Sequence, residues 1–201
     1  MQVSKPTAFS PFFAYLFRLR FIQRWSLMRS ALPENVAEHS YDVALLTHAL
    51  CTIRREVCGQ DIDTGRAVVL ALFHDVAEVI TGDIPSPVKH HDEAIQLNLR
   101  AMESLAGEQL LSMVPEELLP AYRPLIPPSD AHSELMSIVK AADKLAAYLK
   151  CASEIAAGNR EFTVAKRQLE QIVRALHIPE VDYFLEHFAP SFDQTLDEIS
   201  G

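Results

Sequence analysis

The stretch VVLALFHDVAEVITGDIP, residues 68–85, places ionisable side chains directly after an apolar run. The first six residues are apolar on every side of a helix, which predicts that this segment is buried. His74, Asp75 and Glu78 follow within the same expected helix, and burying such groups costs free energy unless something pairs with them. No lysine or arginine lies within four positions of these three residues, so a metal ion is the candidate partner.

Helical periodicity extends over nearly the whole chain, without an alternating strand pattern, a repeat or a low-complexity segment. Only 6 glycines in 201 residues argue against a loop-rich or all-β fold. Asn35 and Glu38 form a capping-box pattern, and Gly82 with the prolines after it ends the helix quoted above. The fold class predicted is therefore all-α, with helices at about residues 9–22, 35–57, 64–80, 92–113, 131–157, 160–176 and 180–199.

Charge is distributed unevenly along the chain. The formal net charge is −9, yet residues 1–33 hold five basic residues and no acidic one, so the remainder carries −14. Binding of a nucleic-acid polymer is not expected, because it requires a field that displaces counterions from many phosphates. A positive corner on an acidic protein fits a small anionic ligand better.

Three cysteines without CxxC spacing fit neither a disulfide framework nor a zinc knuckle. We therefore expect a reducing compartment, the cytoplasm. The apolar run FFAYLF, residues 12–17, is too short to span a membrane, so no membrane partner is expected.

Ligand-type side chains also lie on or beside the apolar faces of two other expected helices. Taken singly, each has an ordinary explanation. A histidine in such a place is usually a core or capping residue, and Asp143 has Lys140 and Lys144 nearby as ion-pair partners. Taken together, four such residues on three helices make a shared metal site the better interpretation; they are His39, His74, Asp75 and Asp143.

The motifs around these residues resemble those of a known family. They are RW at residues 24–25, ENVAEHS at 34–40, HDVAEVITGDIPSPVK at 74–89 and KAADKLAAYLK at 140–150. The order H, then HD, then D in a helical chain resembles the HD-domain metal-dependent phosphohydrolases. The fuller set, along nearly the whole chain, is similar to their bacterial 5′-deoxynucleotidase branch.

The resemblance implies a single HD-domain helical bundle covering residues 1–201. Its metal-binding core would lie at about residues 35–157, and the N-terminal helix with the RW segment, residues 9–34, would complete the nucleotide site. The C-terminal helices would occupy residues 160–199. The resemblance also implies a homodimer.

The activity implied is that of a 5′-deoxynucleotidase, a phosphoric monoester hydrolase. It would convert deoxyribonucleoside 5′-monophosphates to deoxyribonucleoside and phosphate by attack of a metal-bound water. One divalent ion would be held by His39, His74, Asp75 and Asp143. Two imidazoles and two carboxylates suit cobalt, manganese or zinc, and also nickel or iron, so the donor set does not name the metal.

The resemblance also implies roles for residues outside the metal group. Arg24 would bind phosphate and take part in catalysis, which suits its planar guanidinium. Trp25 would pack against the sugar and leave no room for a 2′-hydroxyl. Apart from the resemblance, Glu78 is the candidate to orient or deprotonate the attacking water, and Asp83 is the candidate to assist at the leaving 5′-oxygen. This division of roles between the two carboxylates is a hypothesis. The residues expected to contact the substrate are Arg24, Trp25, Asp83, Ser86, Lys89 and Asp143.

Other interpretations stay open on the sequence. One is another HD phosphohydrolase, acting on nucleoside triphosphates, cyclic nucleotides or alarmones, although the RW and GDIPSPVK elements count against it. A second is a non-catalytic helical protein that binds a metal or a nucleotide, which would not need the carboxylates of Glu78 and Asp83. A third is a helical interaction protein whose charged groups are all paired. The residues do not indicate a base preference.

Overall fold

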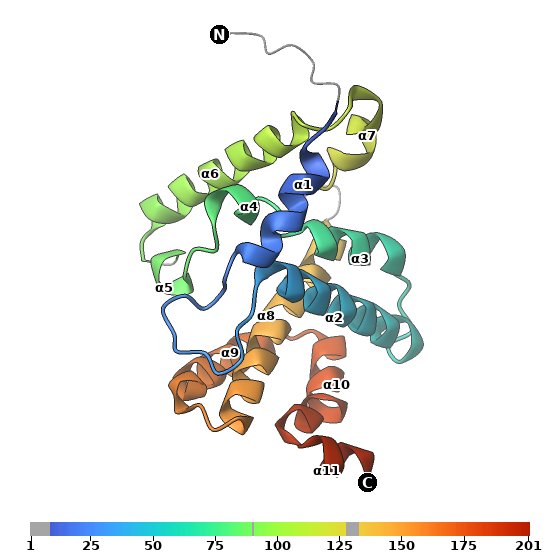
Figure 1. Ribbon diagram of the computed structural model, residues 1–201. Helices are drawn as coiled ribbons and strands as arrows, with labels where there is room; N and C mark the ends of the chain where they lie inside the picture. Colours follow the sequence, from blue (N-terminus) through green and yellow to red (C-terminus); the bar gives the residue numbers. More distant parts are fainter. Residues whose placement is uncertain (1–8, 90, 128–132) are drawn as a thin grey trace.

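The computed structural model describes residues 9–89, 91–127 and 133–201, and within these ranges it contains helices and no strand. The all-α prediction is confirmed. Figure 1 shows α2 (Val36–Glu56), α3 (Thr64–Phe73) and α8 (Ser133–Ala156) packed together at the centre, and the most extensive contacts are those that α2 makes with α3 and α8. The longest of the surrounding helices, α6 (Glu93–Leu111), crosses one end of this group.

The three central helices bury the core of the protein between them. Val43 and Leu50 from α2 belong to the same buried cluster as Leu70 from α3 and Leu145 from α8, and all four side chains are inaccessible to solvent. The Asn35 side chain accepts hydrogen bonds from the N–H groups of Ala37 and Glu38, and the Glu38 carboxylate accepts one from the Asn35 N–H. The predicted capping box is confirmed, and it sets where α2 begins.

The predicted helix over residues 64–80 is wrong as a single helix. Helix α3 ends at Phe73, a turn follows, and the short helix α4 occupies Glu78–Thr81. A continuing helix would use the Ala71 carbonyl to accept the N–H four residues later. Instead, this carbonyl lies 2.7 Å from His74 Nδ1 and 3.4 Å from the His74 N–H nitrogen, so the side chain competes with the helix. Burial of the apolar run is also incomplete, because Leu72 is 44% exposed.

The last predicted helix, residues 180–199, is likewise wrong as one element. Pro190 has no N–H to donate and its ring clashes with the preceding turn, so a helix cannot continue through it. The segment divides into α10 (Pro179–His187), the 3₁₀ turn η5 (Ala189–Asp193) and α11 (Leu196–Ser200).

The remaining elements agree with their predictions except at their ends. The helix predicted at residues 9–22 starts later, as α1 (Phe12–Leu16), and tightens into η1 (Phe17–Phe21). The predicted start of α8 at residue 131 lies outside the described residues. The other bounds are α5 (Ser86–Lys89), η2 (Glu116–Leu118), α7 (Leu119–Tyr122), η4 (Arg160–Phe162) and α9 (Thr163–Ala175). Of these, η2 and α7 lie between the helices predicted at residues 92–113 and 131–157, where no helix was predicted.

The loop between η1 and α2, residues 23–35, is called here the RW loop. An isolated antiparallel bridge joins Gln23 to Asn35, and the Arg24 N–H donates to the Glu34 carbonyl at 3.0 Å. The two ends of the loop are therefore side by side, which brings Arg24 to the start of α2. Among the described residues, no helix is both long and apolar enough to cross a membrane.

Candidate metal and phosphate site

Ligand-type atoms from α2, α8 and the end of α3 converge at one place. His39 on α2 has its Nε2 3.1 Å from Asp143 Oδ1 on α8. His39, His74 and Asp143 each offer a ligand atom within 4.8 Å of the others. Asp75 adjoins them, since its Oδ2 lies 3.1 Å from His74 Nε2 and 3.7 Å from His39 Nε2. All four residues predicted as metal ligands are thus brought together.

The ring of His74 is oriented by its own helix. Its Nδ1 must carry the proton that the Ala71 carbonyl accepts, because a carbonyl cannot donate, so in the neutral ring Nε2 is the acceptor nitrogen. Nε2 is buried and has no hydrogen-bond partner within the described residues. A buried, unpaired nitrogen lone pair beside carboxylate oxygens is a donor set that fits a divalent transition metal.

Electrostatics in this group favour a positive charge. Burial by itself would lower the pKa of His39, but the hydrogen-bonding carboxylates of Asp143 and Glu34 outweigh it and raise this pKa to about 9. Burial would raise the pKa of Asp75, yet the neighbouring His74 brings it down to about 2. Without a metal ion, protonated imidazoles balance the negative charge of the carboxylates. A bound cation would balance that charge instead.

Arg24 reaches the metal group from the RW loop. Its Nε lies 3.1 Å from Glu34 Oε1, and its Nη1 lies 3.6 Å from Asp75 Oδ2. A guanidinium beside the cluster supplies N–H donors of the kind that bind phosphate oxygens. No lysine or arginine lies within four sequence positions of the HD pair, but the folded RW loop brings Arg24 close to it in space.

Trp25 follows in a left-handed backbone conformation, with φ of 58°. This conformation is unfavourable for a bulky residue and is retained only where surrounding contacts impose it. Its Nε1 donates to Glu34 Oε2 at 2.9 Å, and its ring packs edge-on against Phe162 with 5.3 Å between centroids.

Glu34 is a site residue to which the sequence analysis assigned no role. Its carboxylate contacts Arg24 and Trp25, and Oε1 lies 3.3 Å from His39 Nδ1. Burial would raise the pKa of Glu34, but the hydrogen bond with His39 and the charge of Arg24 lower it. In the sequence, Glu34 stands out only by its place beside the capping box in ENVAEHS. No spacing rule predicts that it contacts Arg24 and Trp25, which lie ten and nine positions earlier.

Glu78 lies at the start of α4 and is 4% exposed. Its Oε1 is 3.2 Å from Lys89 Nζ, while its Oε2 is buried without a hydrogen-bond partner in the described part of the chain. Burial and then the charge of Asp75 raise the pKa of Glu78 to about 7, although Lys89 opposes this. A proton can therefore be gained or lost here near neutral pH.

Asp83 and Ser86 lie after the left-handed Gly82, which has φ of 75°. Asp83 is half-buried, and its charge acts on both Glu78 and Arg24. Ser86 is exposed at the first position of α5, and no hydrogen bond joins it to the other described residues of the site. The ion pair considered for Asp143 is also present, with Lys144 Nζ 2.9 Å from Asp143 Oδ2.

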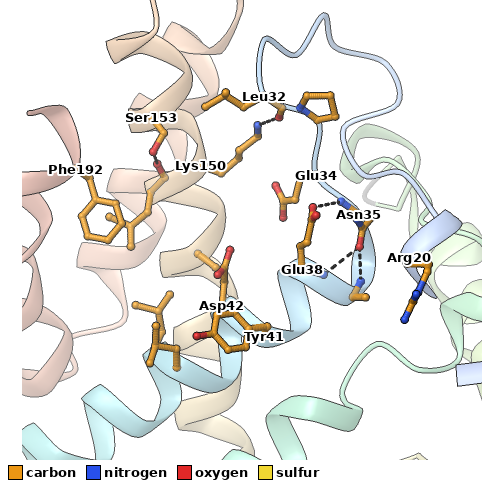
Figure 2. Close-up of a pocket in the computed structure, with 16 residues that line it drawn as sticks. Arg20, Leu32, Glu34, Asn35, Glu38, Tyr41, Asp42, Lys150, Ser153 and Phe192 are labelled. Carbon is orange, nitrogen blue, oxygen red and sulfur yellow. Dashed lines mark hydrogen bonds between the residues drawn. The ribbon is translucent and has the colours of Figure 1, made fainter. Parts of the chain in front are cut away.

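Two hollows border these residues. A small one of about 150 Å³ is lined by His74, Asp75 and Glu78. A larger one of about 780 Å³ is lined by the RW loop, α2 and α8, and Figure 2 shows Glu34 and Lys150 facing it from different elements. Its volume is in the range of small-molecule sites, and Glu34 connects it to the Arg24 and His39 contacts.

Comparison with known proteins places this geometry in context. The family model described as 5′-deoxynucleotidase YfbR-like matches residues 11–192. The chain is 49% identical over 191 residues to the 5′-deoxynucleotidase YfbR of Shigella boydii, covering 95% of this chain and 96% of that protein.

Solved structures agree on the fold. An HD-domain phosphohydrolase from Listeria innocua superposes with a TM-score of 0.75 and 25% identity, covering 90% of this chain and 87% of its own. A cyanophage S-2L HD phosphohydrolase bound to dA and one catalytic Zn²⁺ ion gives a TM-score of 0.62, covering 95% of this chain and 99% of its own. At 19% identity, the second likeness concerns the fold alone.

Proposed function

The chain belongs to the YfbR-like 5′-deoxynucleotidase family, and we propose that its site hydrolyses deoxyribonucleoside 5′-monophosphates to deoxyribonucleoside and phosphate. The observation that carries this proposal is the convergence of His39, His74 and Asp143, with Arg24 3.6 Å from the adjoining Asp75. A cation site with a guanidinium beside it is what a phosphate monoester requires, because its hydrolysis is accelerated chiefly by positioning and charge stabilisation.

A single divalent ion would be held by His39, His74, Asp75 and Asp143, with cobalt, manganese and zinc the candidates. When bound, it supplies positive charge at the phosphoryl group and lowers the pKa of water. Glu34 supports this arrangement, since a carboxylate beside the second nitrogen of a ligating histidine holds the ring in orientation.

Different side chains of the site would then have different roles in the reaction. Arg24 binds the phosphoryl oxygens and stabilises the charge that develops on them. Glu78 accepts a proton from the attacking water while the new bond to phosphorus forms. As the bond from phosphorus to the 5′-oxygen breaks, Asp83 assists proton delivery to that oxygen. Lys89 keeps Glu78 oriented through its ion pair and lines the nucleotide site with Ser86.

Discrimination against ribonucleotides is assigned to Trp25. Its indole is held by Glu34 and Phe162, so it cannot swing aside without breaking a hydrogen bond and a ring contact. A rigid ring against the sugar would clash with a 2′-hydroxyl. Replacing Trp25 by alanine should bring ribo and deoxyribo rates closer together, and an unchanged ratio would refute this assignment.

We also propose a homodimer of single-domain subunits in the cytoplasm. The three cysteines lack the spacing of a disulfide framework, which fits a reducing compartment. Exposed aromatic side chains in the C-terminal third, at Phe188 and Phe192, offer apolar surface for self-association. The net charge of −9 favours a small nucleotide over a nucleic-acid polymer as partner.

The deciding experiment measures phosphate release from matched deoxyribo and ribo 5′-monophosphates and deoxyribo 3′-monophosphates. Chelator-stripped protein is assayed with and without added cobalt, manganese or zinc. Metal-restored release confined to the deoxyribo 5′-monophosphates is expected. Nucleoside triphosphates and cyclic nucleotides are assayed beside this panel for loss of substrate, and hydrolysis of these compounds instead would move the chain to another HD substrate class. No hydrolysis of any substrate under any metal would point to a non-catalytic binder.

A further inference from the structure

Glu154, near the C-terminal end of α8, is a fully buried carboxylate with no part in the site described above. Its Oε2 accepts hydrogen bonds from the Ala31 N–H at 2.8 Å and from Asn159 Nδ2 at 2.7 Å. Its Oε1 accepts from the Leu32 N–H at 3.0 Å and from Lys150 Nζ at 2.5 Å. Four donors therefore converge on one side chain, and two of them are backbone groups of the RW loop.

The two side-chain partners of Glu154 also hold the loop. Lys150 donates to the Leu32 carbonyl, a contact that Figure 2 shows reaching from α8 across to the loop. Asn159 Nδ2 donates to the Arg29 carbonyl at 2.7 Å. The backbone from Arg29 to Leu32 is thus tied to the end of α8 by Glu154 and the two residues that Glu154 orients.

This attachment is connected to the site by two short routes. Along the chain, Leu32 is two residues from Glu34, whose carboxylate binds both Arg24 and Trp25. Through space, Lys150 Nζ lies 5.8 Å from the centre of the Phe162 ring, against which Trp25 packs. Trp25 needs such support, because its left-handed backbone would otherwise relax.

We propose that Glu154 is a positioning residue of the substrate site, which holds the RW loop against α8 and so sets the orientation of Arg24 and Trp25. The inference rests on the proposed function for the roles of those two residues. It adds a determinant of activity and sugar selectivity that does not contact the substrate. A misplacement of about 1 Å at a reacting site can lower the rate about 10²-fold, so loosening this attachment should be visible in catalysis.

Glu154→Gln tests the proposal, because it keeps the shape but loses the charge and replaces one acceptor oxygen by a donor. Trp25 is the only tryptophan, so intrinsic fluorescence of the metal-free protein reports the RW loop without any substrate. We expect emission at longer wavelength, stronger quenching by acrylamide, a kcat/KM for deoxyribo 5′-monophosphates lower by about 10- to 100-fold and a smaller deoxyribo-to-ribo ratio.

Glu180→Gln is the matched control. Glu180 is also a buried carboxylate, 3% exposed, but it pairs with Arg54 at 3.6 Å rather than with the loop. At temperatures well below unfolding, this variant should keep the wild-type fluorescence and the wild-type substrate ratio. If Glu154→Gln does not fold, Lys150→Met removes the bonds to Leu32 and Glu154 while keeping an apolar stem, and the same changes are expected in it.

Wild-type fluorescence and substrate ratio in folded Glu154→Gln or Lys150→Met protein would overturn the proposal, even if the melting temperature fell. Equal changes in Glu180→Gln would overturn it as well, because they would reflect general loosening. A wild-type protein that releases no phosphate would instead overturn the proposed function. The fluorescence comparison needs no substrate, so it would still decide whether Glu154 positions the loop.

Discussion

Arg24 illustrates at the residue scale how this site uses geometry as well as charge. Its Nε pairs with Glu34 and its Nη1 pairs with Asp75, so one planar group joins the RW loop to the residues proposed as metal ligands. A lysine ammonium is a point charge and cannot span both carboxylates while offering paired donors to a phosphate. We expect Arg24→Lys to lower kcat/KM by about 10²- to 10³-fold, similar to the loss of one charge-stabilising donor.

Arg29→Lys is the control for that measurement. Arg29 lies in the same loop, but its side chain is exposed and pairs with Glu161 at 2.6 Å. Surface ion pairs contribute little, so this substitution should leave kcat/KM within about twofold of wild type. An equal fall in kcat/KM in both variants would mean that any lysine in the loop impairs activity. It would contradict a specific role for Arg24 in binding phosphate.

The convergence of the four residues proposed as metal ligands could be predicted from the sequence, because ionisable residues on apolar helix faces are conspicuous. Glu34 and Glu154 could not, because their importance comes from partners that only the folded loop supplies. Glu154 reads in the sequence as an ordinary helix residue in SEIAAGN, and its burial depends on Ala31 and Leu32 returning to α8. Lys89 was expected at the substrate site, but its ion pair with Glu78, which spans the proline-containing turn, was not predicted.

At the scale of elements, the break between α3 and α4 is decided by interactions that periodicity does not detect. Apolar residues continue at helical spacing through Val76, Val79 and Ile80, which is why one helix over residues 64–80 was predicted. The structure shows that the His74 ring takes the Ala71 carbonyl, a local hydrogen bond with no signature in the spacing of apolar residues. The break lets the His74 and Asp75 side chains approach residues of α2 and α8. The helix prediction is therefore wrong at the candidate metal and phosphate site.

Gly82 ends α4 and orients Asp83, and its conformation is one that only glycine adopts readily. With φ of 75° and ψ of 163°, any side chain there would be strained, although no atom beyond the two adjacent residues lies within 4 Å of where a Cβ would be. We expect Gly82→Ala to lower the free energy of unfolding by about 1–3 kcal/mol and also to reduce kcat, because Asp83 would be displaced. Chemical denaturation and steady-state kinetics measure the two effects.

Gly59→Ala separates backbone strain from the effect on Asp83. Gly59 has φ of 68° and equally open surroundings, but it follows α2 at the end away from Asn35 and His39. Its replacement should cost a similar free energy of unfolding while leaving kcat unchanged. A parallel fall in kcat in both variants would show that stability alone governs activity, and Asp83 would not depend on Gly82.

For the whole molecule, the buried Glu154 predicts how the protein responds to acid. Burial would raise the pKa of Glu154, but the hydrogen bond from Lys150 and those from Leu32 and Ala31 lower it to about 2. The folded pKa is below the ordinary value of 4.5, so the stabilisation is complete above pH 4.5 and is lost as pH falls toward 2. Denaturation of metal-free protein across this range should show a steeper loss of stability in wild type than in Glu154→Gln, and parallel curves would contradict the assignment.

The proposed metal site makes the strongest prediction about the molecule as a whole, because its residues come from α2, the end of α3 and α8. An ion that binds only the folded state raises the free energy of unfolding by about 2.7 kcal/mol when its concentration is 100 times Kd. We expect chelator-stripped wild-type protein to melt at increasing temperature as zinc or manganese is added. His74→Ala should lose this dependence, because it removes the buried, unpaired Nε2.

His48→Ala provides the matched comparison, since His48 is an exposed histidine on α2, the helix that carries His39. It should keep the full metal-dependent increase in melting temperature. The increase in each variant, rather than its absolute melting temperature, is the quantity to compare, because His74→Ala also leaves a space at the end of α3. An equal increase in His74→Ala and wild type would place the ion elsewhere, and no increase in wild type would favour a helical protein whose buried charges neutralise one another without metal.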